Sequence, residues 1–292
     1  MSNLYRFENI AGFEEIINDD NSGLKHINFN GLYLEAGEEQ DLQPEDREFA
    51  LVLQKGDFTV NIEEGEKEVF SGVTAYRESV FDQLPTVIYL PPGSKMNIKS
   101  ENGLEMLAYS AKCDSERKAE IIAPQDVNEV YSGIKNWRRR VRVILGPESD
   151  ISEKLIVGES VSIPGGWIGF PAHKHDIECD TEYPLEEIFS FKLDGAQGAM
   201  ALHHTYDTDR DIEEHYLIDD DNYAVAIPDG YHTSQAMPGC RYYLLWGLAG
   251  DCKEYKLTFD PDFAWLQDAE TLFEEGVGKN LGDVMVGKVK TN

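Results

Sequence analysis

Cysteine is scarce in this chain, and long apolar runs are missing. The four cysteines are scattered over 292 residues without a Cys-x-x-Cys pair, so neither a disulfide framework nor a zinc ribbon is expected. No stretch approaches the roughly 18 apolar residues of a membrane span. Arg6 and Glu8 stand where a signal peptide would have its apolar region. These absences predict a soluble, cytoplasmic protein.

Positive charge is also in short supply. Twenty-six Lys and Arg stand against 55 Asp and Glu, which gives a formal net charge of −29. Such a surface repels nucleic acid and anionic membranes, so neither is expected as a partner. One basic cluster, Arg138–Arg142, interrupts the acidic sequence. We expect it to hold lobes or subunits together, with capture of a substrate carboxylate, by Arg142, as the alternative.

Helical periodicity is rare, and short apolar or alternating runs lie between Gly and Pro turn signals. This pattern is typical of an all-β barrel or sandwich. The expected strands include residues 31–35, 49–53, 57–62, 86–90 and 104–109, and then 154–157, 187–193, 199–203, 223–227 and 242–246. Helix is expected only in short pieces, at Ala11–Asn18 and Asp262–Glu274.

The two halves of the chain follow one plan. Ile88–Gly93 and Val225–Gly230 both run an apolar strand into a turn containing Pro and Gly. A chain of this length can form two domains of roughly 100–150 residues. We therefore predict two tandem β-barrels, in residues 1–135 and 136–292.

Histidine is unevenly placed. Only His26 lies in the first half, and the other six fall between positions 173 and 232. His173 and His175 are two residues apart, so on a β-strand both imidazoles face one side. Imidazole is the commonest protein metal ligand, which makes this pair half of a possible four-ligand set. The second barrel is thus expected to hold a metal and the first to be metal-free.

Strand alternation distinguishes two neighbouring carboxylates. Glu187 shares its parity with Phe189, Phe191 and Leu193, whereas Glu186 has the opposite parity. The apolar set should face the interior, which places Glu187 inside. Because burying an unpartnered carboxylate is costly, an inward Glu187 calls for a cation.

His-x-His, a strand-borne Glu and a later Pro-x-Gly-x-His turn resemble the two motifs of the cupin superfamily. The resemblance implies a double-stranded β-helix (jelly-roll) barrel that binds one divalent metal through His173, His175, Glu187 and His232. We expect zinc, with manganese, iron or nickel as alternatives, since a three-nitrogen, one-oxygen ligand set suits all four. Eleven residues separate His175 from Glu187, more than cupins usually have, which indicates a loop at the barrel mouth.

A narrower resemblance is to the 5-deoxyglucuronate isomerases of myo-inositol catabolism, in the uronate isomerase family. The motifs that carry it are Pro171–Asp176, Leu185–Phe189, Pro228–His232, Met237–Gly239, Tyr242–Gly250 and Asp260–Trp265. The similarity covers roughly residues 137–267 well. It implies an aldose–ketose isomerase that converts 5-deoxy-glucuronate to 2-deoxy-5-keto-gluconate. It also implies a small sugar-acid substrate and a homo-oligomer, a dimer or higher.

The chain departs from that family at three places. Gly166 replaces an Asn of the family, Thr233 replaces a Pro, and an arginine expected after Gly198 is absent. His203 and His204 occupy the stretch where that arginine is expected. The proton carriers predicted for the reaction are Tyr231, His203 and His204. A cupin dioxygenase and a non-catalytic sugar-binding bicupin remain the alternative functions.

Overall fold

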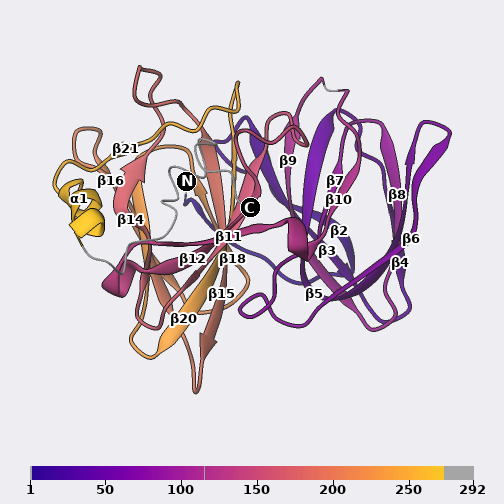
Figure 1. Ribbon diagram of the computed structural model, residues 1–292, viewed down its shortest axis with the longest axis horizontal. Helices are drawn as coiled ribbons and strands as arrows, with labels where there is room; N and C mark the ends of the chain where they lie inside the picture. The colour runs from indigo at the N-terminus through magenta and orange to yellow at the C-terminus, as the bar shows by residue number, and fades with distance from the viewer. Residues whose placement is uncertain (1, 115, 273–292) are drawn as a thin grey trace.

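The chain folds into two packed lobes built almost entirely of β-strands (Figure 1). This computed structural model describes residues 2–114 and 116–272. Three sheets of nine, seven and five strands contain all the named strands of these residues, so the predicted all-β class is confirmed. Within the same residues, no helix is long and apolar enough to cross a membrane.

The first lobe, called the N-terminal lobe, is the nine-stranded sheet folded around its own core. Its strands are β2 (Gly12–Ile17), β3 (Ile27–Leu34), β4 (Glu39–Leu42), β5 (Arg47–Glu64), β6 (Lys67–Arg77), β7 (Val87–Leu90), β8 (Ser94–Lys99), β9 (Leu104–Lys112) and β10 (Glu120–Ile122). The long strand β5 pairs with β7 and β9 in its first part and with β6 and β8 in its second. It therefore joins the two faces of this lobe.

The C-terminal lobe consists of the seven-stranded and five-stranded sheets. The larger sheet contains β1 (Leu4–Arg6), β11 (Asn128–Ser132), β12 (Arg139–Leu145), β13 (Ile156–Ser162), β15 (Glu186–Gly195), β18 (Tyr223–Ile227) and β20 (Cys240–Ala249). The smaller sheet contains β14 (Trp167–Lys174), β16 (Ala201–Asp207), β17 (Ile212–Ile218), β19 (Tyr231–Ala236) and β21 (Thr258–Phe259). The helices are η1 (Pro124–Asp126), η2 (Lys135–Trp137) and α1 (Trp265–Leu272).

The two lobes repeat one strand order. The large sheet of the C-terminal lobe runs β1-β18-β15-β20-β13-β12, and the N-terminal sheet runs β10-β7-β5-β9-β3-β2. Strands β7 and β18, which the two similar turns follow, occupy the same place in each order. The edge strand beside them is β10, the last strand of the N-terminal lobe, in one sheet and β1, from the start of the chain, in the other. The predicted internal repeat therefore has a structural counterpart.

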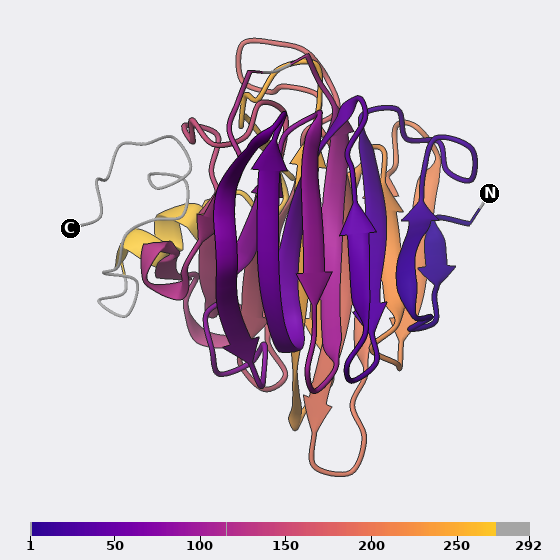
Figure 2. The same ribbon diagram turned by 90° about the vertical axis from the view of Figure 1, so that its right-hand side faces the viewer.

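Strand alternation divides the apolar side chains among three cores. Ile188 of β15 points to the core between the lobes, while Phe189 and Phe191 point into the C-terminal barrel. From the other lobe, Phe29 and Tyr109 join the shared core. Figure 2 shows the strands of the N-terminal lobe in front of those of the C-terminal lobe, running in roughly the same direction. The lobes are thus joined by a full hydrophobic layer.

The basic cluster contributes polar contacts to this junction. Arg142 donates to the carbonyl oxygens of Val80 and Gln83, at 2.8 and 3.0 Å, and Arg140 donates to that of Phe81. These carbonyls belong to the N-terminal lobe. The geometry favours the lobe-holding role predicted for the cluster.

One expected helix is wrong. Residues 12–17 form strand β2, which pairs with β3, because Ile16 and Ile17 are buried in the sheet and cross-strand pairing outweighs local propensity. The second expected helix is present as α1, and its expected end at Glu274 lies outside the described residues. The division into domains at residues 135 and 136 remains a prediction, and the sheets change between β10 and β11.

Candidate metal centre

Three strands of the C-terminal barrel bring four predicted ligands together. His173 lies on β14 and pairs in register with His232 of β19. His175 follows the end of β14, and Glu187 lies near the start of β15. His175 and Glu187 are both buried. Side chains of a strand point alternately to its two faces, so Glu187 faces the barrel interior together with Phe189, two residues further along. The sequence pattern therefore becomes one buried cluster.

The four side chains form a compact set of donor atoms. Oε2 of Glu187 lies 3.2 Å from Nε2 of His175 and 3.1 Å from Nε2 of His232. The ring of His173 lies 4.7 Å from that of His232, centroid to centroid. Ligand atoms of the three histidines lie within 4.8 Å of one another. One ion can reach all of them with small side-chain adjustments.

Backbone carbonyls fix which nitrogen of each histidine faces the centre. Nδ1 of His175 donates to the carbonyl of Leu185 at 2.8 Å, and Nδ1 of His232 donates to that of Gly230 at 3.1 Å. Because a carbonyl oxygen only accepts, the proton resides on Nδ1 in both rings. The Nε2 lone pairs are then directed at the centre, in the arrangement that orients metal-binding histidines.

The donor set fits a divalent cation. Nε2 of His232 is buried and lacks a hydrogen-bond partner, despite its closeness to Glu187. Burial would raise the pKa of Glu187, but its interactions with the side chains of His175 and His232 outweigh burial and lower it to about 2. Burial, with the two neighbouring histidines, lowers the pKa of His173 well below its usual value. An ionised carboxylate and neutral imidazoles are the forms that bind metal.

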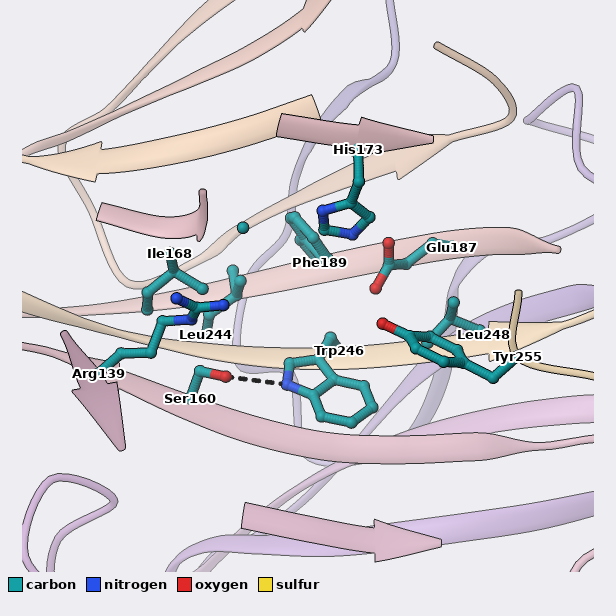
Figure 3. A pocket seen from close by; sticks show the side chains of 11 residues that line it. Arg139, Ser160, Ile168, His173, Glu187, Phe189, Leu244, Trp246, Leu248 and Tyr255 are labelled. Atoms are coloured by element: carbon teal, nitrogen blue, oxygen red, sulfur yellow. Dashed lines mark hydrogen bonds between the residues drawn. The ribbon is translucent and has the colours of Figure 1, made fainter. Parts of the chain in front are cut away.

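A pocket opens beside this cluster (Figure 3). His173, Glu187 and Tyr255 lie toward one end of it, and Arg139 lies toward the other. Its remaining lining residues, mostly apolar, are Ser160, Ile168, Gly169, Phe189, Leu244, Trp246 and Leu248. The guanidinium of Arg139 donates to the carbonyls of Trp137 and Phe170, at 3.1 and 3.3 Å. The pocket thus carries a positive charge at a distance from its histidine end.

The alternation of β12 separates Arg139 from Arg142. Arg139 lines the pocket, whereas Arg142 belongs to the opposite face and binds Glu159 at 2.5 Å and Glu129 at 2.7 Å. Arg142 is only 1% exposed. The structure therefore does not bring Arg142, the arginine predicted to bind substrate, to the pocket.

The three predicted proton carriers also lie away from the pocket lining. Tyr231 and His204 have strand parity opposite to His232 and His203, and they project from the outer face of the five-stranded sheet. His203 points inward, but both of its ring nitrogens are hydrogen-bonded, to Ser234 and Thr205, each at 2.9 Å. None of the three lines the pocket in the part of the chain that the structure describes.

Tyr255 is a pocket residue that the sequence did not reveal. It lies in the segment between β20 and β21, where no strand alternation indicates its direction. Burial, and then the charge of Glu187, raise the pKa of its hydroxyl, so the phenol stays protonated at neutral pH. The one sequence feature that could have pointed to Tyr255 is its position shortly after the motif of residues 242–250.

Comparison with known proteins identifies the fold and the family. A protein named 5-deoxy-glucuronate isomerase from Geobacillus kaustophilus is 29% identical over 258 residues, covering 87% of this chain and 90% of the relative. An IolB-like protein from Salmonella typhimurium has a similar structure, with a TM-score of 0.82 and 27% identity, covering 90% of this chain and 98% of that protein.

An oxalate decarboxylase from Lactobacillus farciminis shares the fold alone, with a TM-score of 0.58 and 12% identity, covering 92% of this chain and 88% of that protein. The predicted tandem cupin barrels are thereby confirmed, and so is the predicted isomerase class, from the names of the relatives. The model of the KduI/IolB family matches residues 9–266. The chain therefore belongs to the KduI/IolB family.

Proposed function

We propose that this protein is a metal-dependent aldose–ketose isomerase whose substrate is a deoxy uronic acid, 5-deoxy-glucuronate or a close analogue. The observation that carries the proposal is the pocket, which joins a His and Glu donor cluster to a buried arginine. A uronic acid has the matching features, a carbonyl at one end and a carboxylate at the other. The relatives named 5-deoxy-glucuronate isomerase support the same substrate class.

His173, His175, Glu187 and His232 would hold the divalent cation. When bound, the cation supplies a Lewis acid that polarises the substrate carbonyl. We expect zinc, with manganese, iron or nickel as alternatives. The hydrogen bonds from Nδ1 to backbone carbonyls keep the rings of His175 and His232 oriented with Nε2 toward the cation.

Arg139 would bind the substrate carboxylate. The residue is 9% exposed, and its pocket neighbours Ile168 and Leu244 are apolar, so water would screen its attraction for a carboxylate only weakly. A guanidinium can bind a carboxylate through two parallel hydrogen bonds. In this role Arg139 would stand in for the arginine that the family resemblance led us to expect after Gly198. It would fix which end of the sugar acid faces the histidines.

Tyr255 would hold a proton beside the reacting carbons. Its hydroxyl lies in the pocket toward the same end as Glu187 and His173. A phenol with a raised pKa is a hydrogen-bond donor to substrate oxygen, which develops negative charge as the carbonyl shifts. Tyr255 is thus proposed as the donor to oxygen, and the predicted proton carriers Tyr231, His203 and His204 do not line the pocket in the described part of the chain.

The decisive experiment incubates Zn²⁺-loaded protein with 5-deoxy-glucuronate and follows new ketose signals by NMR. We expect turnover in the wild type and its loss in Glu187→Gln with circular dichroism unchanged, since the fold rests on apolar cores. Absence of turnover with any deoxyuronate or hexuronate would overturn the proposal. Binding without turnover would instead favour a sugar-binding bicupin. Oxygen consumption that requires Fe²⁺ would favour a dioxygenase.

Self-association into a dimer or larger homo-oligomer stays part of the proposal. Size-exclusion chromatography with light scattering tests it directly, and a monomer at micromolar concentration would contradict it.

A further inference from the structure

A second group of metal-ligating side chains lies outside the barrel. His204 of β16 pairs in register with His215 of β17, and Glu213 lies two residues before His215 on the same strand. All three project from the outer face of the five-stranded sheet, opposite in parity to His203. This outer cluster, defined as His204, Glu213 and His215, is therefore separated from the pocket by the sheet itself.

The donor atoms of the outer cluster converge on one point. Oε1 of Glu213 lies 3.2 Å from Nε2 of His204 and 2.5 Å from Nε2 of His215. Ligand atoms of the three residues lie within 4.8 Å of one another. The ligand atoms of the three barrel histidines are grouped within the same distance. Exposed side chains can close the remaining gap by small rotations.

Ring stacking holds the two imidazoles in a common orientation. The rings of His204 and His215 stack at 4.2 Å with an interplanar angle of 19°. Tyr206 stacks on His204 at 4.5 Å, two residues along the same strand. The cluster is thus ordered before any ion arrives, which lowers the entropic cost of binding.

The electrostatics favour the neutral form of His204. Two imidazolium rings stacked this closely would repel each other, and burial with the nearby His215 lowers the pKa of His204. Neutral imidazole is the metal-binding form. Two nitrogens and one carboxylate oxygen match the ligand types preferred by zinc, nickel and copper ions.

We propose that His204, Glu213 and His215 form a second site for a divalent transition metal, on the outer surface of the C-terminal barrel. The site supplies three protein ligands and leaves further coordination positions to water or to a donor from another molecule. Because the outer cluster is more exposed to solvent, we expect its affinity for the metal to be lower than that of the barrel centre. It does not depend on the isomerase activity.

The test titrates tag-free, metal-free full-length protein with Zn²⁺ by isothermal titration calorimetry. We expect two equivalents for the wild type and one for His215→Ala. The same loss is expected for Glu213→Gln, whose smaller change guards against misfolding. His26→Ala is the matched control, because His26 is a partly exposed histidine outside both groups and should retain two equivalents.

His173→Ala separates this proposal from the barrel site. It should remove the tighter equivalent and leave the weaker one. If His215→Ala and Glu213→Gln both bind as many equivalents of Zn²⁺ as the wild type does, the proposal of an outer site is overturned. Loss of an equivalent in His215→Ala, with none lost in His173→Ala, supports the outer site and contradicts the barrel centre.

Discussion

At the scale of single residues, one basic cluster serves two faces of β12. Arg139, Val141 and Val143 face the C-terminal barrel, while Arg140 and Arg142 face the other lobe. The cluster therefore has two roles. Because side chains alternate along a strand, Arg139 lines the pocket, whereas Arg140 and Arg142 lie at the lobe junction.

Arg139→Gln should raise KM for the deoxyuronate roughly 10- to 100-fold and change kcat little. A charge-assisted hydrogen bond contributes about 1.5–3 kcal/mol, and each 1.4 kcal/mol is about a factor of ten in affinity. Steady-state kinetics measure the effect. Arg140→Gln, on the same strand but the opposite face, is the matched control. Equal KM values for the two variants would refute the role of Arg139.

Tyr255→Phe should lower kcat about 100-fold, the loss expected when one hydrogen-bond donor to a developing oxyanion is removed. Tyr231→Phe should leave kcat within about twofold, because Tyr231 projects from the outer face of the sheet. The comparison of kcat for the two variants decides between the sequence-based assignment and the structural one. A larger loss in Tyr231→Phe would restore the former.

His203 should make the metal-free protein sensitive to acid. Burial, and then the neighbouring His232, lower its pKa from 6.5 to about 3. Between these values the unfolded chain binds a proton that the folded chain does not, so stability is complete above pH 6.5 and declines toward pH 3. The slope is about 1.4 kcal/mol per pH unit. Urea unfolding at several pH values should show a shallower slope for His203→Gln, and parallel slopes would contradict this.

At the scale of elements, strand alternation predicted orientation well. It placed Glu187 inside with Phe189, and the structure has Glu187 5% exposed. Glu186, assigned to the other side, accepts hydrogen bonds from the backbone nitrogens of Lys25 and His26. That Glu187 binds metal stays a prediction.

Alternation could not predict what lies between strands. Tyr255 sits in a loop without a period, so its approach to the pocket depends on tertiary folding. Residues 12–17 show the same limit, since their strand conformation depends on pairing with β3 and not on their own local pattern. Local pattern thus predicted several of the strands and the histidine cluster, but not Tyr255.

Gly247 of β20 should resist substitution because an aromatic ring occupies the space above it. A Cβ at this position would lie 2.4 Å from Cγ of Tyr109. The Tyr109 hydroxyl donates toward the carbonyls of Ile188 and Leu245, each at 2.9 Å. Gly247→Ala should cost about 1–3 kcal/mol of unfolding free energy, as overpacked cores do.

Gly23→Ala is the control for this prediction. No atom lies within 4 Å of a Cβ built there, so the change should stay within about 0.5 kcal/mol. Thermal melts of both variants give the comparison. Equal melting temperatures would show that Tyr109 moves aside without cost.

At the scale of the whole molecule, the lobes share a core and a buried ion cluster. Glu159 of β13 binds Nη2 of Arg77 at 2.6 Å and Nη1 of Arg142 at 2.5 Å, and it accepts from Tyr243 at 2.7 Å. Arg77 belongs to the N-terminal lobe, the other three to the C-terminal lobe. Because this cluster and the apolar layer span the junction, the lobes should unfold together.

Glu159→Gln should cost about 3–5 kcal/mol, since it removes the charge partner of the buried Arg77 and leaves the buried Arg142 with Glu129 alone. Urea unfolding would be followed by circular dichroism, which reports on both lobes, and by fluorescence of the four tryptophans, which all lie between residues 137 and 265. Both midpoints should fall together. Glu153→Gln, at a more exposed pair with Arg117, should cost no more than about 1 kcal/mol. A shift in fluorescence alone would show that the lobes unfold separately.

The pairing of β1 with β18 has a consequence for synthesis of the chain. Leu4 pairs with Val225, so β1 is synthesised long before the strand it pairs with. Until β18 is made, β1 is an extended segment without its sheet, and until β1 docks, that edge of β18 is bare. Closing so long a loop is slow, and an uncovered strand edge is a site for pairing with other chains. Docking of β1 therefore ends the interval in which the nascent protein is most exposed to aggregation.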